Sequence, residues 1–506
     1  MATSIPAPGS RGEHRGLAYW MERTLKELEK VRASPDPDAV HDLRVAIRRC
    51  RSVGAVMSEV DPDSSWRTMR KLARKLFRQL GALRDTQVLQ EWIEHLSEPH
   101  DPVRLSLLDS LKKQEAELRE ASLALAAKFD EKAWRKLERR LQRRSRTVPP
   151  DRLAAECLAL ERLEAARELH AHALRVDKPE AWHALRIGVK RFRYTVEALL
   201  PARYAEWGDD LKHIQDLLGE VHDLDVLSTV VKESPAASTE ELRARWAGRV
   251  ANERQRRIER YLELTSGKGS FWQTWRQALP QGRRLDSAAM ARLRVTARAL
   301  DENPSRTSLI SRLSLQLFEG LARVHAAPEF QSRENRKLMR AAARLHGIGS
   351  GLDAESPEKA ARKFLRELTL PPGWTKEEME LMATVVRYQR GPAPREKHKF
   401  FARLPEAGQK TVSALAGIVR LARTLRKCNV DSPIGLRIEQ SPDAVTVYVP
   451  GLSDSEQVAS RLASGKYLLE TFLAKPLILR PAPPALRVVE LPAPETLPPQ
   501  SAAASD

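Results

Sequence analysis

Apolar side chains recur at the three- and four-residue spacing of α-helices from about Leu17 to Phe271. Breaks that contain proline interrupt this spacing at 34–37, 61–62, 149–150 and 201. A Gly/Ser stretch at 266–270 ends the block, and a second helical block runs from about Ser287 to Cys428. The pattern therefore predicts two helical domains with a boundary near 275–285.

The pattern changes after the second block. Residues 434–440 and 444–449 are typical of two strands joined by a turn, with β-branched residues alternating in the second. A helix near 453–473 and a short strand near 477–479 complete a small α+β element. The predicted domains are a disordered tail at 1–15, helical domains at 16–280 and 288–480, and a Pro/Ala-rich tail at 481–506.

Composition adds a charge to this mainly helical fold. The 506 residues carry a formal net charge of +19, which favours a polyanion such as nucleic acid, an anionic membrane or inorganic polyphosphate. Aromatic residues make up only 5%, which argues against single-stranded nucleic acid because its sites usually stack bases on aromatic rings. Three scattered cysteines and the lack of a signal-peptide or membrane-spanning apolar run predict a cytoplasmic protein without membrane association.

An internal duplication is the strongest feature of the first domain. The segment from His41 to Arg51 recurs 142 positions later, from His183 to Arg193, with a leading His, a Leu, an Arg and a pair of cations in register. A Leu-Gly-x-x-x-Asp segment follows each copy and ends at Asp85 or Asp223, 138 positions apart. Two segments repeated in the same order predict two similar helical bundles that face each other.

Each copy places its cations on one narrow helical face, because they are spaced three, four and three residues apart. The two faces carry His41, Arg44, Arg48 and Arg51, and His183, Arg186, Lys190 and Arg193. Stacked cations repel one another unless an anion or solvent screens them. Two such faces brought together would form a positive cleft for a long repeating anion, since guanidinium forks pair two phosphate oxygens at once.

Further cations extend the predicted binding set. Segment 131–146 is a third basic helix with eight cations and two acids, and it either supports the cleft or forms a solvated surface. Asp85 and Asp223 are interpreted as residues that close a tight turn or pair with an arginine of the stripes. The predicted anion-binding residues are His41, Arg44, Arg48, Arg49, Arg51, Arg74, Arg135, Arg139, His183, Arg186, Lys190, Arg191, Arg193 and Lys212.

The twin His-x-x-Arg segments, each followed by Leu-Gly-x-x-x-Asp, resemble the CHAD domain, the conserved-histidine α-helical domain, over roughly residues 10–275. The resemblance implies two pseudo-symmetric four-helix bundles around a basic groove. It also implies binding of inorganic polyphosphate and association with polyphosphate granules. The basic positions of that family correspond here to the two stripes on the repeated helices.

The second half, about 288–480, resembles the C-terminal helical domain of the exopolyphosphatase and guanosine-pentaphosphatase family, which is HD-related. An HD metal site needs His and Asp ligands. Here Gly347 follows His346, and the other ligand positions carry Arg306, Arg423 and Arg426. The actin-like phosphatase domain of that family has no counterpart. We therefore expect no metal, no cofactor and no catalysis, and we expect His346 to be a hydrogen-bonded core residue. The arginines, with Arg387 and Arg390, are a candidate second phosphate-binding surface.

The resulting hypothesis is a non-catalytic protein that binds inorganic polyphosphate. Two alternatives stay open at this point: a metal-dependent phosphohydrolase that acts on polyphosphate or a nucleotide, and a nucleic-acid-binding protein. No helix-turn-helix, zinc-finger or RNA-binding signature supports the second alternative, so nucleic acid is not the expected partner. A homo-oligomer, or a partnership with polyphosphate-metabolising enzymes, is compatible with the sequence.

Overall fold

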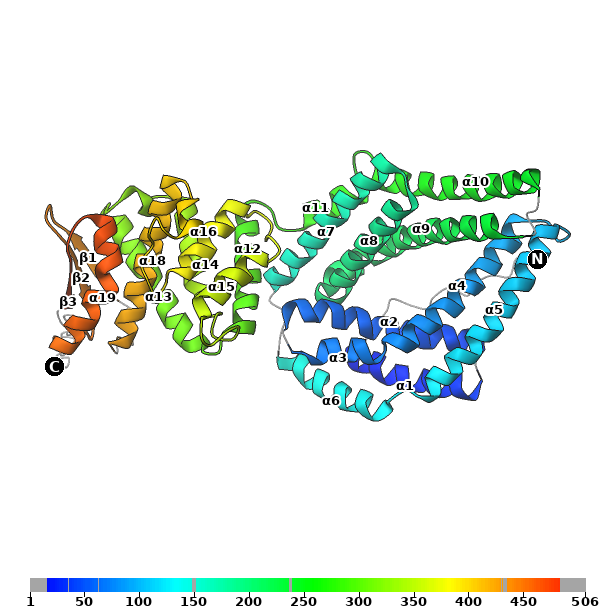
Figure 1. The fold of residues 1–506 in the computed structure, drawn as a ribbon, viewed down its shortest axis with the longest axis horizontal. Helices are drawn as coiled ribbons and strands as arrows, with labels where there is room; N and C mark the ends of the chain where they lie inside the picture. Colours follow the sequence, from blue (N-terminus) through cyan, green and yellow to red (C-terminus); the bar gives the residue numbers. More distant parts are fainter. Residues whose placement is uncertain are drawn as a thin grey trace, which may run out of the picture. The chain divides into compact units, whose positions relative to one another are not determined.

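The computed structural model describes residues 16–34, 36–61, 63–147, 152–235, 239–428, 430 and 435–482 (Figure 1). This part of the chain is mainly helical, with 19 α-helices and a three-stranded sheet near the C-terminus, which confirms the predicted fold class. The chain forms two compact units: the first contains the residues up to Glu302 with 347–355 and 367–379, and the second contains 303–346, 356–366 and the residues from Glu380 onward. None of the helices in the described residues has the length and apolar character needed to cross a membrane.

The first unit consists of two successive sets of helices. The first set contains α1 (Leu17–Ala33), α2 (Pro37–Val60), α3 (Ser65–Leu72), α4 (Arg74–Leu96), α5 (Pro102–Ala127) and α6 (Glu131–Thr147). The second set contains α7 (Arg152–Val176), α8 (Pro179–Leu199), α9 (Pro201–Glu233), α10 (Glu240–Thr265), α11 (Phe271–Ala278) and α12 (Gly282–Leu300).

Helix starts follow the local chemistry. Asp36 accepts a hydrogen bond from the Ala39 backbone N–H at 2.8 Å and precedes Pro37, so it caps α2. Asp101 caps α5 in the same way, and Pro201 begins α9 directly after α8 ends. The predicted breaks at 34–37, 61–62 and 201 are confirmed, whereas the one at 149–150 lies outside the described residues.

The two sets of helices are pseudo-symmetric. Four long helices of the first set, α1, α2, α4 and α5, correspond to α7, α8, α9 and α10. Equivalent helices also contact each other, since α2 packs against α8 and α4 packs against α9. Contact between equivalent elements is the arrangement of an approximate twofold axis, and it places the duplicated segments on adjoining helices.

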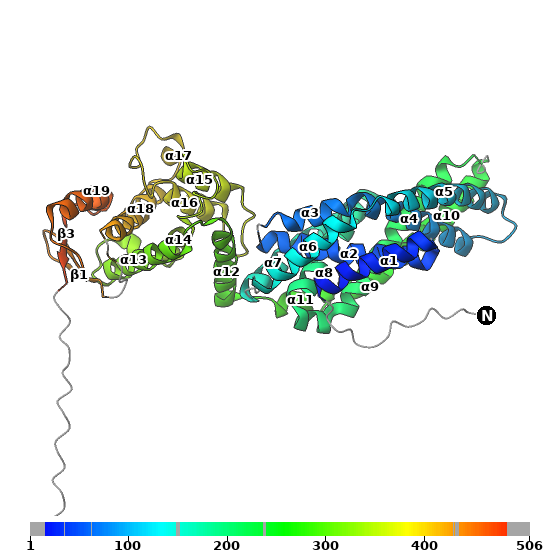
Figure 2. The same cartoon turned by 90° about the horizontal axis from the view of Figure 1, so that it is seen from below.

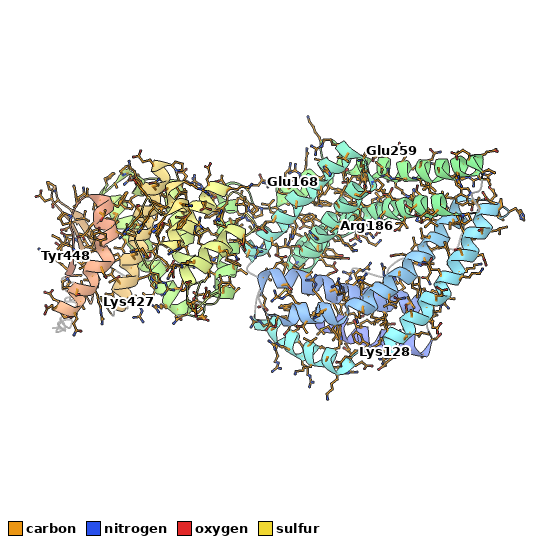
Figure 3. All side chains as sticks on the ribbon, viewed as in Figure 1. Lys128, Glu168, Arg186, Glu259, Lys427 and Tyr448 are labelled. Carbon is orange, nitrogen blue, oxygen red and sulfur yellow. The ribbon has the colours of Figure 1, made fainter. Side chains whose placement is uncertain are left out.

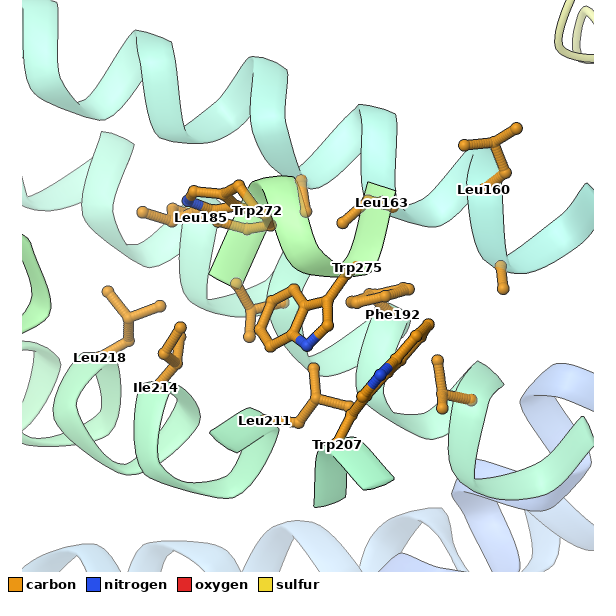
Figure 4. Packing of buried hydrophobic residues seen from close by; sticks show 14 of the residues in the cluster. Leu160, Leu163, Leu185, Phe192, Trp207, Leu211, Ile214, Leu218, Trp272 and Trp275 are labelled. Carbon is orange, nitrogen blue, oxygen red and sulfur yellow. The ribbon is translucent and has the colours of Figure 1, made fainter. Parts of the chain in front are cut away.

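Three apolar cores hold this unit together. One core lies mainly within the second set of helices, with Val56 added from α2, and it includes Phe192, Trp207 and Trp275 (Figure 4). Another lies within the first set, around Trp66 and Trp134. The third joins the far ends of α4 and α5 to α9 and α10 (Figure 2). Because this third core takes residues from both sets, the two sets are fixed relative to each other.

The second unit is built around α18 (Glu406–Lys427), which packs against α13 (Pro304–Arg323), α14 (Arg333–Leu345) and α19 (Glu456–Leu473). Gly465 lets α19 approach α18 closely, because a Cβ there would overlap the Thr424 side chain. The remaining helical elements are η1 (Pro328–Phe330), α15 (Pro357–Glu367), α16 (Lys376–Arg387) and α17 (Lys399–Ala402).

The predicted α+β element is confirmed. β1 (Arg437–Gln440) pairs antiparallel with β2 (Val445–Val449), and β2 pairs parallel with β3 (Leu477–Pro481). The expected start of the first strand at Ile434 lies outside the described residues, as do both predicted tails, apart from Pro481 and Ala482 at the end of β3.

Candidate functional site

The two predicted cationic stripes lie on α2 and α8, which pack against each other. Burial lowers the pKa of the Arg44 guanidinium, and the charges of Arg48, Arg84 and Arg186 lower it further. Arg186, labelled in Figure 3, belongs to α8 in the other half of the repeat. Charges that shift one another's pKa lie close together, so the stripes meet across the pseudo-symmetry axis.

Lys190 on α8 is likewise affected by cations from both stripes. Burial, followed by the charges of Arg186, Arg48 and Arg44, lowers the pKa of its ammonium group to about 8. Two of these three arginines belong to α2. Neither Arg48 nor Lys190 has an ion-pair partner in the part of the chain that the structure describes. We call the residues that interact here the central cluster: His41, Arg44, Arg48, Arg84, Asp85, His183, Arg186, Lys190, His222 and Asp223.

The histidines of the central cluster are held in their neutral form. Burial lowers the pKa of His41, and Arg84 and Arg48 lower it further. His183 and His222 face each other with their Nδ1 atoms 3.3 Å apart, and burial together with Arg186 lowers the pKa of His222 to about 4. Both imidazoles line a surface pocket of about 360 Å³. An approaching anion would reverse this shift and convert the imidazoles into charged donors.

The two repeated aspartates lie within helices α4 and α9, so the prediction that they close tight turns is wrong. The alternative, pairing with an arginine of the stripes, agrees with Asp85, whose Oδ1 lies 3.8 Å from Arg44 Nη2. Burial raises the pKa of Asp223 to about 6 despite the opposing charge of Arg186. With a pKa of about 6, this carboxyl is mostly ionised at neutral pH and loses its negative charge as the pH falls below about 6.

The glycines that precede these aspartates leave open space beside α4 and α9. Gly81 and Gly219 lie four residues before Asp85 and Asp223, on the same helical face. A Cβ built at either glycine would meet no atom within 4 Å. Glycine inside a helix costs about 1 kcal/mol relative to alanine, and among the described residues no neighbouring element fills the space that either glycine leaves.

Besides the two aspartates, which are not among the predicted anion-binding residues, the cluster contains two further residues outside that prediction, Arg84 and His222. They occupy equivalent positions, one residue before each repeated aspartate. Because Arg84 and His222 differ in residue type, they give no signal as a repeated residue, and their common feature is a positive or ionisable side chain.

The remaining cations of the stripes have partners of their own. Arg49 forms an ion pair with Glu197 and lies 5.4 Å from the Trp20 ring. Arg51 donates to the Arg70 carbonyl and lies over Phe77 at 4.9 Å. Buried Arg193 donates from Nη2 to the Tyr204 hydroxyl at 3.5 Å, and Arg191 is exposed. The three partnered residues, Arg49, Arg51 and Arg193, are less available to a ligand than Arg48 or Lys190, whereas exposed Arg191 is accessible.

Arg74 and Lys212 occupy equivalent positions in the two halves, but their surroundings differ. Exposed Arg74 lowers the pKa of Arg51, after burial and Arg70. It also lines a surface pocket of about 980 Å³ with three further cations, Lys71, Lys75 and Arg78. Lys212 instead pairs with Asp216 at 2.7 Å. Equivalent positions thus carry Arg78 in one half and Asp216 in the other, so only one side of the cluster continues into a basic pocket.

The third basic helix is placed apart from the cluster. α6 packs on α1 and α3 through Trp134 and Leu141, and Arg144 fastens it to Asp61 at 2.7 Å. Arg135 and Arg139 are exposed, and neither shifts the pKa of a central-cluster residue. The two residues therefore lie on an exposed face of α6, and their part in anion binding stays a prediction.

In the second unit, two positions where an HD domain would have metal ligands, Arg306 and Arg423, lie near His346, but both carry cations. His346 is only 4% exposed, and burial together with Arg423 and Arg306 lowers its pKa to about 3. Its Nδ1 lies 2.7 Å from the Ala343 carbonyl oxygen, which confirms the predicted hydrogen-bonded core histidine. A search of the described residues finds no group of three or more His, Cys, Asp or Glu side chains suited to a metal ion.

With this geometry established, comparison with known families gives two matches. Residues 17–232 match the family model described as CHAD domain, and residues 297–446 match the model described as Ppx/GppA phosphatase, domain III. The chain joins a CHAD domain to a Ppx/GppA domain III. The CHAD match contains both stripes and the whole central cluster, and the phosphatase match is to domain III alone. A comparison with curated proteins finds no match.

Together the two domains indicate a role connected with polyphosphate. The CHAD domain supplies the duplicated basic helices, and domain III supplies the arginines around His346. Both resemblances inferred from the sequence are therefore confirmed at the level of the domains.

Proposed function

We propose that the CHAD domain binds inorganic polyphosphate at the central cluster, that it does so without hydrolysing the polymer, and that the protein associates with polyphosphate granules. The observation that carries this proposal is the meeting of two cationic stripes from the two halves of a repeat. Arg44 and Arg48 on α2 lie within electrostatic reach of Arg186 and Lys190 on α8.

The spacing of the cluster suits a linear anion. Cations three and four residues apart rise about 4.5 to 6 Å along a helix axis, so each stripe presents charges at regular intervals. A polymer of phosphate groups offers charges in the same repeating manner, and guanidinium groups bind two of its oxygens at once. Two adjoining stripes can contact such a chain from both sides.

The same surroundings argue against nucleic acid as the preferred ligand. Binding sites for single strands stack bases on exposed aromatic rings. Phe77 lies beside the stripes, but Arg51 already lies over its ring at 4.9 Å, with Arg44 at 6.0 Å. A ligand made of phosphate groups alone needs no such ring.

The test is the binding of long-chain polyphosphate to a variant with two charge reversals, Arg44→Glu with Arg186→Glu. Each charge-assisted contact contributes about 1.5 to 3 kcal/mol, so we expect affinity to fall by at least about 100-fold. Neutralisation of the two unpaired cations, Arg48→Gln with Lys190→Gln, gives a second variant that changes no ion pair and is expected to show a similar loss.

The matched control is Arg135→Glu with Arg139→Glu, which changes the net charge by the same amount on exposed residues of α6. We expect this control to lose less than about threefold at about 150 mM salt, where distant charges are screened. Equal losses in the cluster variant and the α6 variant would overturn the proposed site. Release of phosphate from the polymer with a divalent metal present would overturn the non-catalytic function.

A further inference from the structure

Arginines from three separate segments of the second unit gather around His346. Arg306 lies in the first turn of α13, Arg390 follows α16, and Arg423 belongs to α18. Besides burial, which has the largest effect, all three charges lower the pKa of the His346 imidazole. The three guanidinium groups therefore lie near one buried side chain, although they are distant in sequence.

Arg423 is the best-held member of this group. Its Nη1 donates to Gln389 Oε1 at 2.9 Å, and Gln389 Nε2 donates to the His346 carbonyl oxygen at 2.6 Å. Gln389 is only 3% exposed, so these buried hydrogen bonds hold the Arg423 guanidinium in place. Burial, followed by Arg390 and Arg306, lowers the pKa of Arg423 to about 10. The partner of Arg423 is a neutral amide, so this hydrogen bond does not neutralise the charge of the largely buried guanidinium.

One carboxylate serves several arginines here. Glu358 lies 3.3 Å from Arg390 Nε and 3.8 Å from Arg387 Nη1, and it also opposes the lowered pKa of Arg423. Arg387 Nη1 is buried without a hydrogen-bond partner among the described residues. Exposed Arg306 has no ion pair within that same part of the chain. The group therefore keeps a surplus of positive charge, with Arg306 and Arg390 open to solvent.

We propose that Arg306, Arg390 and Arg423 bind a compact phosphate group, either free pyrophosphate or the terminal phosphate of a longer molecule. Three guanidinium groups carried by different segments can surround the oxygens of a multiply charged tetrahedral anion, whereas a carboxylate has only two oxygens to offer. The amino-terminal end of α13, a helix of 20 residues, adds its partial positive charge beside Arg306. This site is independent of the central cluster, since its residues belong to the second unit.

The experiment measures pyrophosphate binding by calorimetry on the full chain. The cluster variant Arg44→Glu with Arg186→Glu serves as the background, so that binding by the first unit is suppressed. In that background we expect one pyrophosphate to bind, and Arg306→Gln with Arg390→Gln to weaken it by about tenfold or more. Both substituted residues are exposed, so the fold is expected to survive.

The matched control is Arg312→Gln with Arg340→Gln. Both arginines are exposed, lie on α13 and α14, and do not shift the pKa of His346 or Arg423. We expect the control to keep its pyrophosphate affinity within about threefold, because distant exposed charges are screened by salt. The proposal is overturned if the cluster background binds no pyrophosphate, or if the control loses as much affinity as Arg306→Gln with Arg390→Gln.

Two further ligands identify the source of the phosphate. ATP carries a terminal phosphate on an organic molecule, and long-chain polyphosphate carries one on an inorganic polymer. Equal losses for pyrophosphate, ATP and polyphosphate in the Arg306→Gln, Arg390→Gln variant assign the site to terminal phosphates in general, whereas a loss confined to pyrophosphate assigns it to the free ion. Polyphosphate affinity of the cluster variant tests the first unit separately, so failure of one site is distinguishable from failure of the other.

Discussion

The Asp223→Asn substitution tests whether the central cluster is arranged for an anion. Asp223 on α9 is faced by Arg186 of α8, Arg44 of α2 and Asp85 of α4, with Glu220 on its own helix. Burial raises the pKa of this carboxyl from 3.8 to about 6. At about 1.4 kcal/mol for each pH unit, ionising it at neutral pH costs the folded protein at most about 3 kcal/mol.

The sign of the effect on stability follows from linkage. The unfolded chain ionises this carboxyl near pH 3.8 and the folded chain near pH 6, so stability falls as pH rises through that window and the loss is complete above it. Asparagine cannot ionise and keeps the shape of the side chain. We therefore expect the free energy of unfolding of Asp223→Asn to exceed that of the parent by up to about 3 kcal/mol at pH about 7.5 and to equal it near pH 4.

Ligand binding should follow the same pH window. Ionised Asp223 competes with phosphate for Arg186, so the parent protein should bind polyphosphate more tightly as pH falls from about 7.5 to about 5.5. His41 and His183 contribute in the same direction when they gain protons, which makes the difference between parent and variant the informative quantity. At pH about 7.5 we expect Asp223→Asn to bind about tenfold more tightly than the parent, and the gap to close at pH about 5.5.

The measurements are denaturant unfolding and polyphosphate titration at a series of pH values. The control is Asp216→Asn, which removes the same charge from an exposed turn of α9 where the carboxylate pairs with Lys212. We expect this control to keep the parent's pH dependence. The reasoning is refuted if Asp223→Asn follows the parent's pH profile, or if it unfolds more easily or binds more weakly at pH about 7.5.

Three other outcomes follow from the first unit. Lys75→Gln with Arg78→Gln should weaken long-chain polyphosphate about tenfold and leave tripolyphosphate unchanged in titrations, because these cations line the pocket beyond the central cluster. Lys212→Gln at the equivalent side should have little effect on either ligand. Gly81→Leu should fold, as circular dichroism would show, yet bind polyphosphate more weakly, because the new side chain fills space that is open in the free protein. Trp275→Ala should lower the free energy of unfolding by about 3 to 5 kcal/mol in denaturant, since Trp275 is fully buried in the core of the second set of helices.

Much of the first unit could be predicted because its information is local and repeated. Helical spacing placed the cations of α2 on one face, and the duplication required a second helix of the same kind. Leu43 and Ile47, which lie on α2 away from the cationic face, are fully buried as helical spacing requires. Prolines and aspartates at the helix starts supplied the boundaries.

What the sequence could not predict has one local cause and one long-range cause. Of the two roles expected for Asp85, the tight turn is wrong because Leu80 and Leu83 are both buried, and their burial keeps α4 continuous through the glycine. The basic helix α6 carries the same charges as a binding helix. Its position depends on where Trp134 packs, and the Trp134 indole N–H donates to the Met21 carbonyl oxygen at 3.0 Å, far away in sequence. Such long-range contacts leave no periodic signal in the sequence.

The symmetry of the CHAD domain itself explains why cations face cations. When equivalent helices of a duplicated unit pack against each other, a residue on one helix faces its own counterpart on the other. α2 on α8 and α4 on α9 are contacts of this kind. A stripe of cations then meets a second stripe of cations, and Glu197 of α8, which pairs with Arg49 of α2, lies beside the central cluster. Under the proposed function, an anion from outside the chain stabilises this arrangement, and the cost of holding Arg44, Arg48, Arg186 and Lys190 together without one becomes binding energy when that anion binds.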